Sequence, residues 1–161
     1  MKTIRRRRLE HKTDYKARLG LLKSNMPKLV VRKSNRYITV QLVISDIAQD
    51  KVIKTANSKE LLAYGWPKEN IGSLKNIVAS YLTSILLFHK LGKSAPKEAI
   101  LDSGMYRNVP RSKIYGALKG AIDSGIKIPH DNSILPNDKD FKKNDKMMPI
   151  MDKIMKELKH G

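Results

Sequence analysis

The segment 37–44 alternates between two kinds of side chain, and this pattern restricts the fold more than any other. Apolar residues fill every second position: Ile38, Val40, Leu42 and Ile44. Alternate residues of a β-strand point to opposite faces of a sheet, so this strand has one apolar and one polar face. Two further strands are expected at 29–33 and 51–55, with a turn at 34–36 and a loop at 46–50. We therefore predict an antiparallel meander with one polar face.

Helical spacing follows the meander. Apolar residues recur every three or four positions from about Asn70 to Leu91: Ile71, Leu74, Ile77, Val78, Tyr81, Leu82, Ile85 and Leu86. A strand at 98–102, a helix from about Ser112 to Gly125 and a terminal helix within 147–158 come next. This order predicts an α/β fold in which a mixed sheet, the three-stranded meander plus one further strand, is covered by helices. Trp66 and Tyr81 are expected in the core, and the Met-rich terminal face is either a packing strip or a partner surface.

Positive charge is concentrated near the N-terminus. The 161 residues include 33 Lys and Arg against 15 Asp and Glu, a net charge of +18. Residues 1–36 hold 13 of the cations and two of the acids, so a net +11 lies there. The run Arg5–Arg8 repels itself, and a polyanion that neutralises it releases counterions. We predict an arm that contacts nucleic acid, partly extended and partly helical, with Asp14 as a helix cap; an address signal or a solubilising tail is the alternative.

A second basic group falls at the turn between the first two strands. Basic, amide and aromatic side chains gather there: Arg32, Lys33, Asn35, Arg36 and Tyr37. Such a mixture can hold phosphate and stack on an unpaired base. A solvated hairpin with ordinary turn residues is the alternative interpretation. The neighbouring basic arm favours binding.

Several classes of function are excluded or disfavoured. The chain has no cysteine, which excludes disulfides, thiolate zinc sites and cysteine nucleophiles. It shows neither a bilayer-length apolar run nor an apolar secretory signal, so we expect a soluble intracellular protein without a membrane partner. The four histidines are scattered, and no phosphate-binding loop or nucleophile motif is present. We expect surface histidines, no cofactor, no metal and no small-molecule substrate.

The enzymatic alternative is a metal-dependent nuclease of the ribonuclease-H-like type. Its carboxylates would be Asp46, Asp102 and Asp131. Two-metal cleavage needs several converging acids, whereas the first strands carry apolar or neutral residues from Val30 to Ser45, apart from Arg32, Lys33 and Arg36. Asp46 and Asp50 are explained as turn formers. We therefore disfavour this alternative.

A series of collinear segments resembles one known family. The segments are Arg5–Arg8, 12–19, 27–36, Tyr64-Gly65-Trp66, 98–102, 117–121, 128–130 and 134–136. Together they resemble the 5S-rRNA-binding family of large-subunit ribosomal protein number eighteen, in its archaeal form. The resemblance implies a non-enzymatic constituent of the cytoplasmic ribosome that attaches 5S rRNA to the large-subunit rRNA and contacts neighbouring proteins, including number five. A general nucleic-acid-binding protein is the alternative within the binding class.

The resemblance also implies which residues contact RNA. In the arm these are Arg5, Arg6, Arg7, Arg8, Lys12, Tyr15 and Arg18. In the hairpin they are Arg32, Lys33, Asn35, Arg36 and Tyr37. The loop 104–108 and the residues after it would add Arg107, Arg111 and Lys113. We divide the chain into a basic arm (1–27), an α/β RNA-binding domain (28–128) and a C-terminal extension (129–161).

Overall fold

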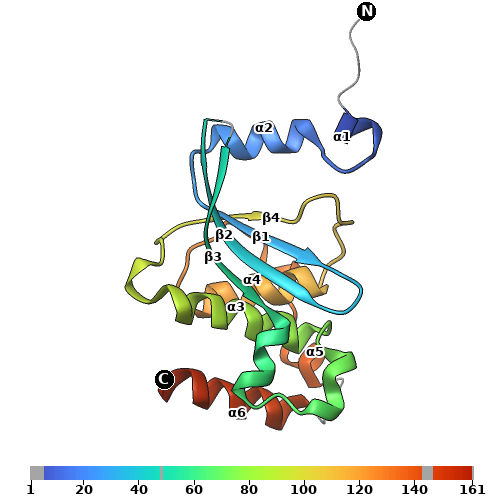
Figure 1. Ribbon diagram of the computed structural model, residues 1–161, viewed down its shortest axis with the longest axis vertical. Helices are drawn as coiled ribbons and strands as arrows, with labels where there is room; N and C mark the ends of the chain where they lie inside the picture. Colours follow the sequence, from blue (N-terminus) through green and yellow to red (C-terminus); the bar gives the residue numbers. More distant parts are fainter. Residues whose placement is uncertain (1–5, 48, 143–146, 161) are drawn as a thin grey trace, which may run out of the picture.

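The computed structural model describes residues 6–47, 49–142 and 147–160 (Figure 1). Its strands are β1 (Lys28–Lys33), β2 (Ile38–Asp46), β3 (Gln49–Asn57) and β4 (Ile100–Asp102). Its α-helices are α1 (Arg6–Leu9), α2 (Tyr15–Lys23), α3 (Ile77–Leu91), α4 (Lys113–Asp123), α5 (Asp138–Lys142) and α6 (Met148–His160). Short 3-10 helices are η1 (Ser58–Tyr64), η2 (Lys68–Ser73), η3 (Gly92–Ser94) and η4 (Asn132–Ile134). None of the described helices is both long and apolar enough to cross a membrane.

The four strands form one mixed sheet in the order β3-β2-β1-β4. Strands β1 and β2 pair antiparallel from Lys28↔Val43 to Lys33↔Ile38, and β2 pairs antiparallel with β3. Strand β4 lies parallel to β1, with Lys28 opposite Ile100. The predicted fold class, a meander plus a further strand in a mixed sheet, is therefore confirmed.

The core lies between the sheet and the helices α3 and α4. Five sheet residues that face these helices are at most 1% exposed: Leu29, Val31, Ile38, Val40 and Leu42. Helices α3 and α4 approach closely where α4 carries Gly120, because a Cβ there would lie 2.4 Å from the Tyr81 carbonyl oxygen. Trp66 and Tyr81 are buried, as predicted. Burial, followed by a hydrogen bond to Asp123, raises the pKa of the Tyr81 hydroxyl.

The C-terminal helix completes the packing. Figure 1 shows α6 on the side of α3 that faces away from the sheet. Ile154 and Leu158 are buried, and Met151 and Met155 pack against the same core. The apolar face of this helix is therefore a packing strip. The division of the chain at residues 27 and 128 stays a prediction.

Some local predictions were wrong. Helix α3 begins at Ile77 instead of Asn70, because the Asn76 side chain caps it by accepting the Ala79 N–H. Ile44 is 44% exposed, since the β2–β3 hairpin extends beyond the helices that cover the rest of this face. The expected loop at 46–50 is a tight hairpin, because β2 runs to Asp46 and β3 starts at Gln49. The expected strand at 98–102 is shorter and only half-buried.

Candidate nucleic-acid interface

The arm folds back onto the sheet. Asp14 begins α2 by accepting the N–H groups of Lys16 and Ala17 at 2.9 and 3.1 Å, as an N-cap should. Figure 1 shows α2 on one side of the sheet and α3 and α4 on the other. Leu19 is exposed, so this leucine does not dock the helix onto the domain. Gly20 lies within α2, which continues to Lys23.

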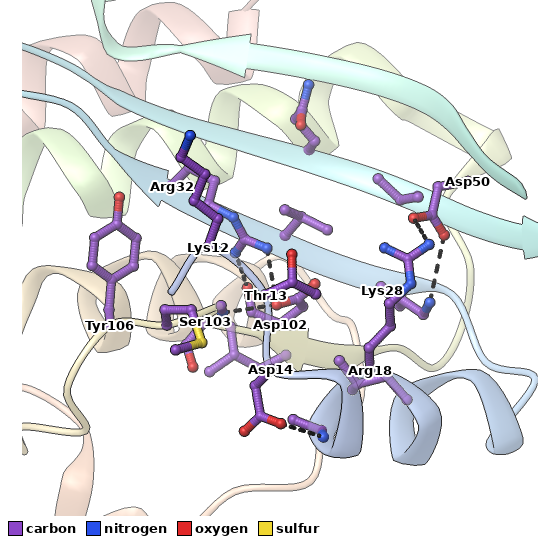
Figure 2. A pocket seen from close by; sticks show the side chains of 18 of the residues that line it. Lys12, Thr13, Asp14, Arg18, Lys28, Arg32, Asp50, Asp102, Ser103 and Tyr106 are labelled. Carbon is purple, nitrogen blue, oxygen red and sulfur yellow. Dashed lines mark hydrogen bonds and ion pairs between the residues drawn. The ribbon is translucent and has the colours of Figure 1, made fainter. Parts of the chain in front are cut away.

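Charged side chains attach α2 to the β2–β3 hairpin. Arg18 lies 3.0 Å from the Asp50 carboxylate. Lys28, whose side chain is 5% exposed, donates to the Ser45 hydroxyl at 2.6 Å and lies 3.7 Å from Asp50 (Figure 2). The Ser45 hydroxyl donates to Asp50, and this bond, followed by the charges of Arg18 and Lys28, lowers the pKa of the Asp50 carboxyl. The Asp50 carboxylate thus pairs with two cations, Arg18 of the arm and Lys28 of β1, and holds the arm.

This cluster contains residues that sequence reasoning missed. Asp50 was explained as a turn former, but it lies in β3 opposite Ser45. Lys28 was assigned no role, although it is buried at the start of β1. The alternation of β2 could have placed Ser45 in this cluster. When it is extended to position 45, Ser45 falls on the same face as Gln41 and Val43. The cross-strand partner depends on the register, which a bulge shifts between Leu42 and Val43.

The arm and the open face of the sheet enclose a cavity of about 800 Å³ (Figure 2). Its cationic lining comes from two segments of the chain, the arm and β1. These residues are Arg7, Lys12, Arg18, Lys28 and Arg32. Val30 and Val43 contribute apolar surface from β1 and β2, and Leu101 and Tyr106 line the side formed by β4 and the following segment. The cavity thus combines positive charge with apolar walls.

At the other end of the open face, the segment after β4 is fastened to β1. The Arg32 guanidinium lies 3.0 Å from the Asp102 carboxylate and donates to the Asp102 carbonyl at 2.8 Å. Gly104 has a φ of 64° and lies so close to Arg32 that a Cβ would be 3.0 Å from Cζ. The Tyr106 hydroxyl accepts the Lys33 N–H and donates to the Lys33 carbonyl. Two segments 70 residues apart therefore form one surface.

The remaining predicted residues occupy distinct positions. In the arm, Arg6, Arg7 and Arg8 are exposed on α1, and Lys12 and Arg6 both contact Glu10 at 2.8 Å. Hydrogen bonds from Lys12 and then Arg6 lower the pKa of Glu10. Tyr15, at the start of α2, is half-buried. Arg5 lies outside the described residues.

Beyond the arm, the structure brings only some of the predicted residues together. Asn35 and Arg36 are exposed at the β1–β2 turn, whereas Tyr37 is half-buried and packs against the core. Arg107 is exposed in the segment after β4. Arg111 lies 3.8 Å from Asp140, and Lys113 begins α4. Arg36, Arg107 and Arg111 do not line the cavity beneath the arm.

The three aspartates of the nuclease alternative have separate structural roles. Asp102 binds Arg32 and accepts the Gly104 N–H, and Asp131 accepts the Ser133 N–H. Asp46 ends β2. Across residues 6–47, 49–142 and 147–160, no three His, Cys, Asp or Glu residues are grouped so that they could hold a metal ion. His11, His89 and His130 are exposed, as expected.

Taken together, these features define a class: a folded α/β protein that presents cations from an arm, a hairpin and a loop around one open sheet face, as expected of a structural RNA-binding protein. The comparisons agree. The family model described as "Ribosomal large subunit proteins 60S L5, and 50S L18" matches residues 1–95 and 89–131.

Curated relatives carry the name large ribosomal subunit protein uL18. The Korarchaeum cryptofilum protein is 45% identical over 152 residues, which cover 94% of this chain and 75% of the relative. The Methanoregula boonei protein is 44% identical, with 83% and 74% covered. The Methanococcus maripaludis protein is 44% identical over 83% of this chain and 67% of the relative. The chain belongs to this family of large-subunit ribosomal proteins, which confirms the resemblance seen in the sequence and makes it a structural, non-enzymatic component of the ribosome.

Proposed function

We propose that this ribosomal protein binds 5S rRNA and attaches it to the large-subunit rRNA, beside neighbouring proteins that include number five. The observation that carries the proposal is the joint surface of the arm, the β1–β2 turn and the segment after β4. These segments present cations on or beside the sheet face that the helices leave open. A surface of this width suits a folded RNA, which is recognised through shape, phosphates and unpaired bases.

The proposed RNA contacts fall into two groups. Exposed cations and amides would contact phosphate directly: Arg6, Arg7, Arg8, Lys12, Lys33, Asn35, Arg36 and Arg107. Arg5 belongs with them by its position in the arginine run. Arg18, Arg32 and Arg111 bind acids outside the run of α1, so they would share their charge with phosphate while they position the arm and the loop. Arg6 and Lys12 likewise share the Glu10 carboxylate. Tyr15, Tyr37 and Lys113 would add contacts at the edges of this surface.

A competition between nucleic acids tests the proposal. We expect the full chain to bind 5S rRNA more tightly than random RNA of equal length or duplex DNA, because shape and unpaired bases add to the phosphate contacts. Affinities should be compared at one physiological salt concentration, since phosphate contacts make binding depend on salt. Equal affinity for all three would contradict 5S rRNA attachment and favour a general nucleic-acid binder.

A further inference from the structure

The N-termini of α3 and α4 lie side by side and bring two lysines together. Ser80, in the first turn of α3, donates its hydroxyl to the Lys113 carbonyl at the start of α4. Gly116 permits this approach, because a Cβ there would lie 3.1 Å from the Ile77 carbonyl oxygen. Lys75 precedes α3, and Lys75 and Lys113 line one surface hollow of about 340 Å³. Sequence reasoning assigned no role to Lys75.

Among the described residues that line the hollow, two lysines accompany a single acid, Asp140. Among the described residues, no acid forms an ion pair with Lys33, Lys75 or Lys113. Asp140, which shares the hollow, lies 3.8 Å from Arg111 and accepts the Asn137 N–H. Burial, followed by repulsion from Lys75 and Lys33, lowers the pKa of the Lys113 amine. Lys113 therefore lies in a region of excess positive charge, where Asp140, the one carboxylate among the described lining residues, is shared with Arg111.

Two buried hydrogen-bonding groups beside these lysines lack a partner. The Asn76 amide nitrogen, in the lining of the hollow, and the Ser112 hydroxyl make no hydrogen bond within the described part of the chain. The Asn76 oxygen accepts the Ala79 N–H, so its nitrogen is left as a donor. Ser112 stands at the N-cap of α4 but makes no capping bond. Buried polar groups without a partner are rare in folded proteins, and each of these two groups keeps an unused hydrogen-bond donor beside the lysines.

We propose that Lys75 and Lys113 form a lysine patch that binds the phosphodiester backbone of ribosomal RNA, as a contact additional to the arm. Lys33 is not part of the hollow's lining, and its Nζ lies 5.0 Å from the centre of the Tyr106 ring. Two lysines in the lining of one surface hollow suit the repeated phosphates of an RNA chain. The N–H groups at the starts of α3 and α4 add to the positive potential. The inference rests on the proposed function and adds Lys75 to its contacts.

Charge-matched variants of the full chain test the lysine patch. The patch variant carries Lys75→Gln and Lys113→Gln, and the control carries Lys127→Gln and Lys156→Gln, which remove the same charge from exposed positions elsewhere. Affinity for 5S rRNA is measured over a series of salt concentrations. We expect the patch variant to bind more weakly and to lose about two from the slope of log affinity against log salt, about one per lysine. If the patch and control variants give the same slope, the proposal that the lysine patch binds RNA is wrong.

Two further measurements separate the outcomes. Random RNA of equal length is titrated in parallel. If the wild-type chain does not prefer 5S rRNA, the proposed function is wrong. The salt slopes measured with either RNA still show whether the lysine patch binds RNA. Modification by an amine-reactive reagent should be slowed by RNA at Lys75 and Lys113 and unchanged at Lys127. If inorganic phosphate protects the two lysines but RNA does not, the site binds a free anion and the RNA contact is wrong.

Discussion

The two faces of the sheet are built from neighbouring residues of the same strands, yet they are stabilised differently. On the helix face, Leu29, Val40 and Leu42 are completely buried, and removal of apolar surface from water is the main stabilising term. On the open face, Lys28, Arg32 and Asp50 form ion pairs around a cavity. Partly exposed pairs such as Arg32–Asp102 contribute little to stability. The helix face therefore maintains the fold, and the open face can exchange protein partners for RNA.

Within the basic surface, a second contrast separates cations by their partners. Arg18 and Arg32 bind carboxylates of the protein itself, whereas Lys75 and Lys113 have no ion pair in the described ranges. A cation that already has an acid partner gains less from a phosphate. Net charge alone thus overstates how much α2 contributes to RNA binding. It understates the contribution of the lysines at the N-termini of α3 and α4.

The sharpest test of the two faces uses adjacent residues of β2. Leu42→Ala, on the helix face, should lower the free energy of unfolding by about 2–5 kcal/mol, because it leaves a cavity in a packed core. Val43→Ala, on the arm face, removes fewer atoms beside an existing cavity and should cost about 1–2 kcal/mol. Denaturant unfolding measures both. Equal losses would show that the arm packs as firmly as the helices.

The arm variant should have the next largest effect, on RNA affinity. Replacing Arg6, Arg7 and Arg8 with Ala should weaken binding to 5S rRNA and reduce the salt slope by up to about three, because three phosphate contacts are lost. The control replaces Lys139, Lys153 and Lys156 with Gln, which removes equal charge from exposed positions near the C-terminus. An unchanged slope in the arm variant would remove these arginines from the interface.

Loss of the Asp50 carboxylate should detach the arm helix with a smaller energetic effect. Asp50→Asn leaves Arg18 and the buried Lys28 without their acid. The partly exposed Arg18 pair should contribute up to about 1 kcal/mol, and the loss of the charge beside the buried Lys28 adds to this cost. Hydrogen exchange at residues 15–23 should become faster while the core strands keep their protection. Asp46→Asn, at an exposed acid of the same hairpin, serves as the control. If residues 15–23 stay equally protected, the ion pairs do not hold the arm.

The smallest predicted effect is a pH dependence of the same contact. The pKa of Asp50 is lower in the folded protein than its ordinary value of 3.8, so its ionised form stabilises the folded state. That contribution is complete above the unfolded pKa and is lost as the pH falls through the folded pKa. Unfolding measured between pH 5 and pH 2 should show this loss in the wild type, and the difference from Asp50→Asn should shrink toward zero at the acid end. A constant difference would contradict the role of the charge.

The sequence by itself determined the elements and the location of most of the charge. The alternation in 38–42 and the spacing from Ile77 to Leu86 identified the sheet and its covering helix because side-chain periodicity is a local property of the chain. The arginine run and the collinear family segments likewise needed no coordinates. They were sufficient for the fold class and the family.

Only the tertiary structure decided which charges have partners. Asp50 meets Arg18 and Lys28 because of the β2–β3 register and the return of the arm, and Asp102 meets Arg32 because β4 lies parallel to β1. Lys75 and Lys113 become neighbours because Gly116 lets two helix starts approach. Ion pairing depends on distances of a few ångströms between residues tens of positions apart, and no local pattern in the sequence encodes those distances.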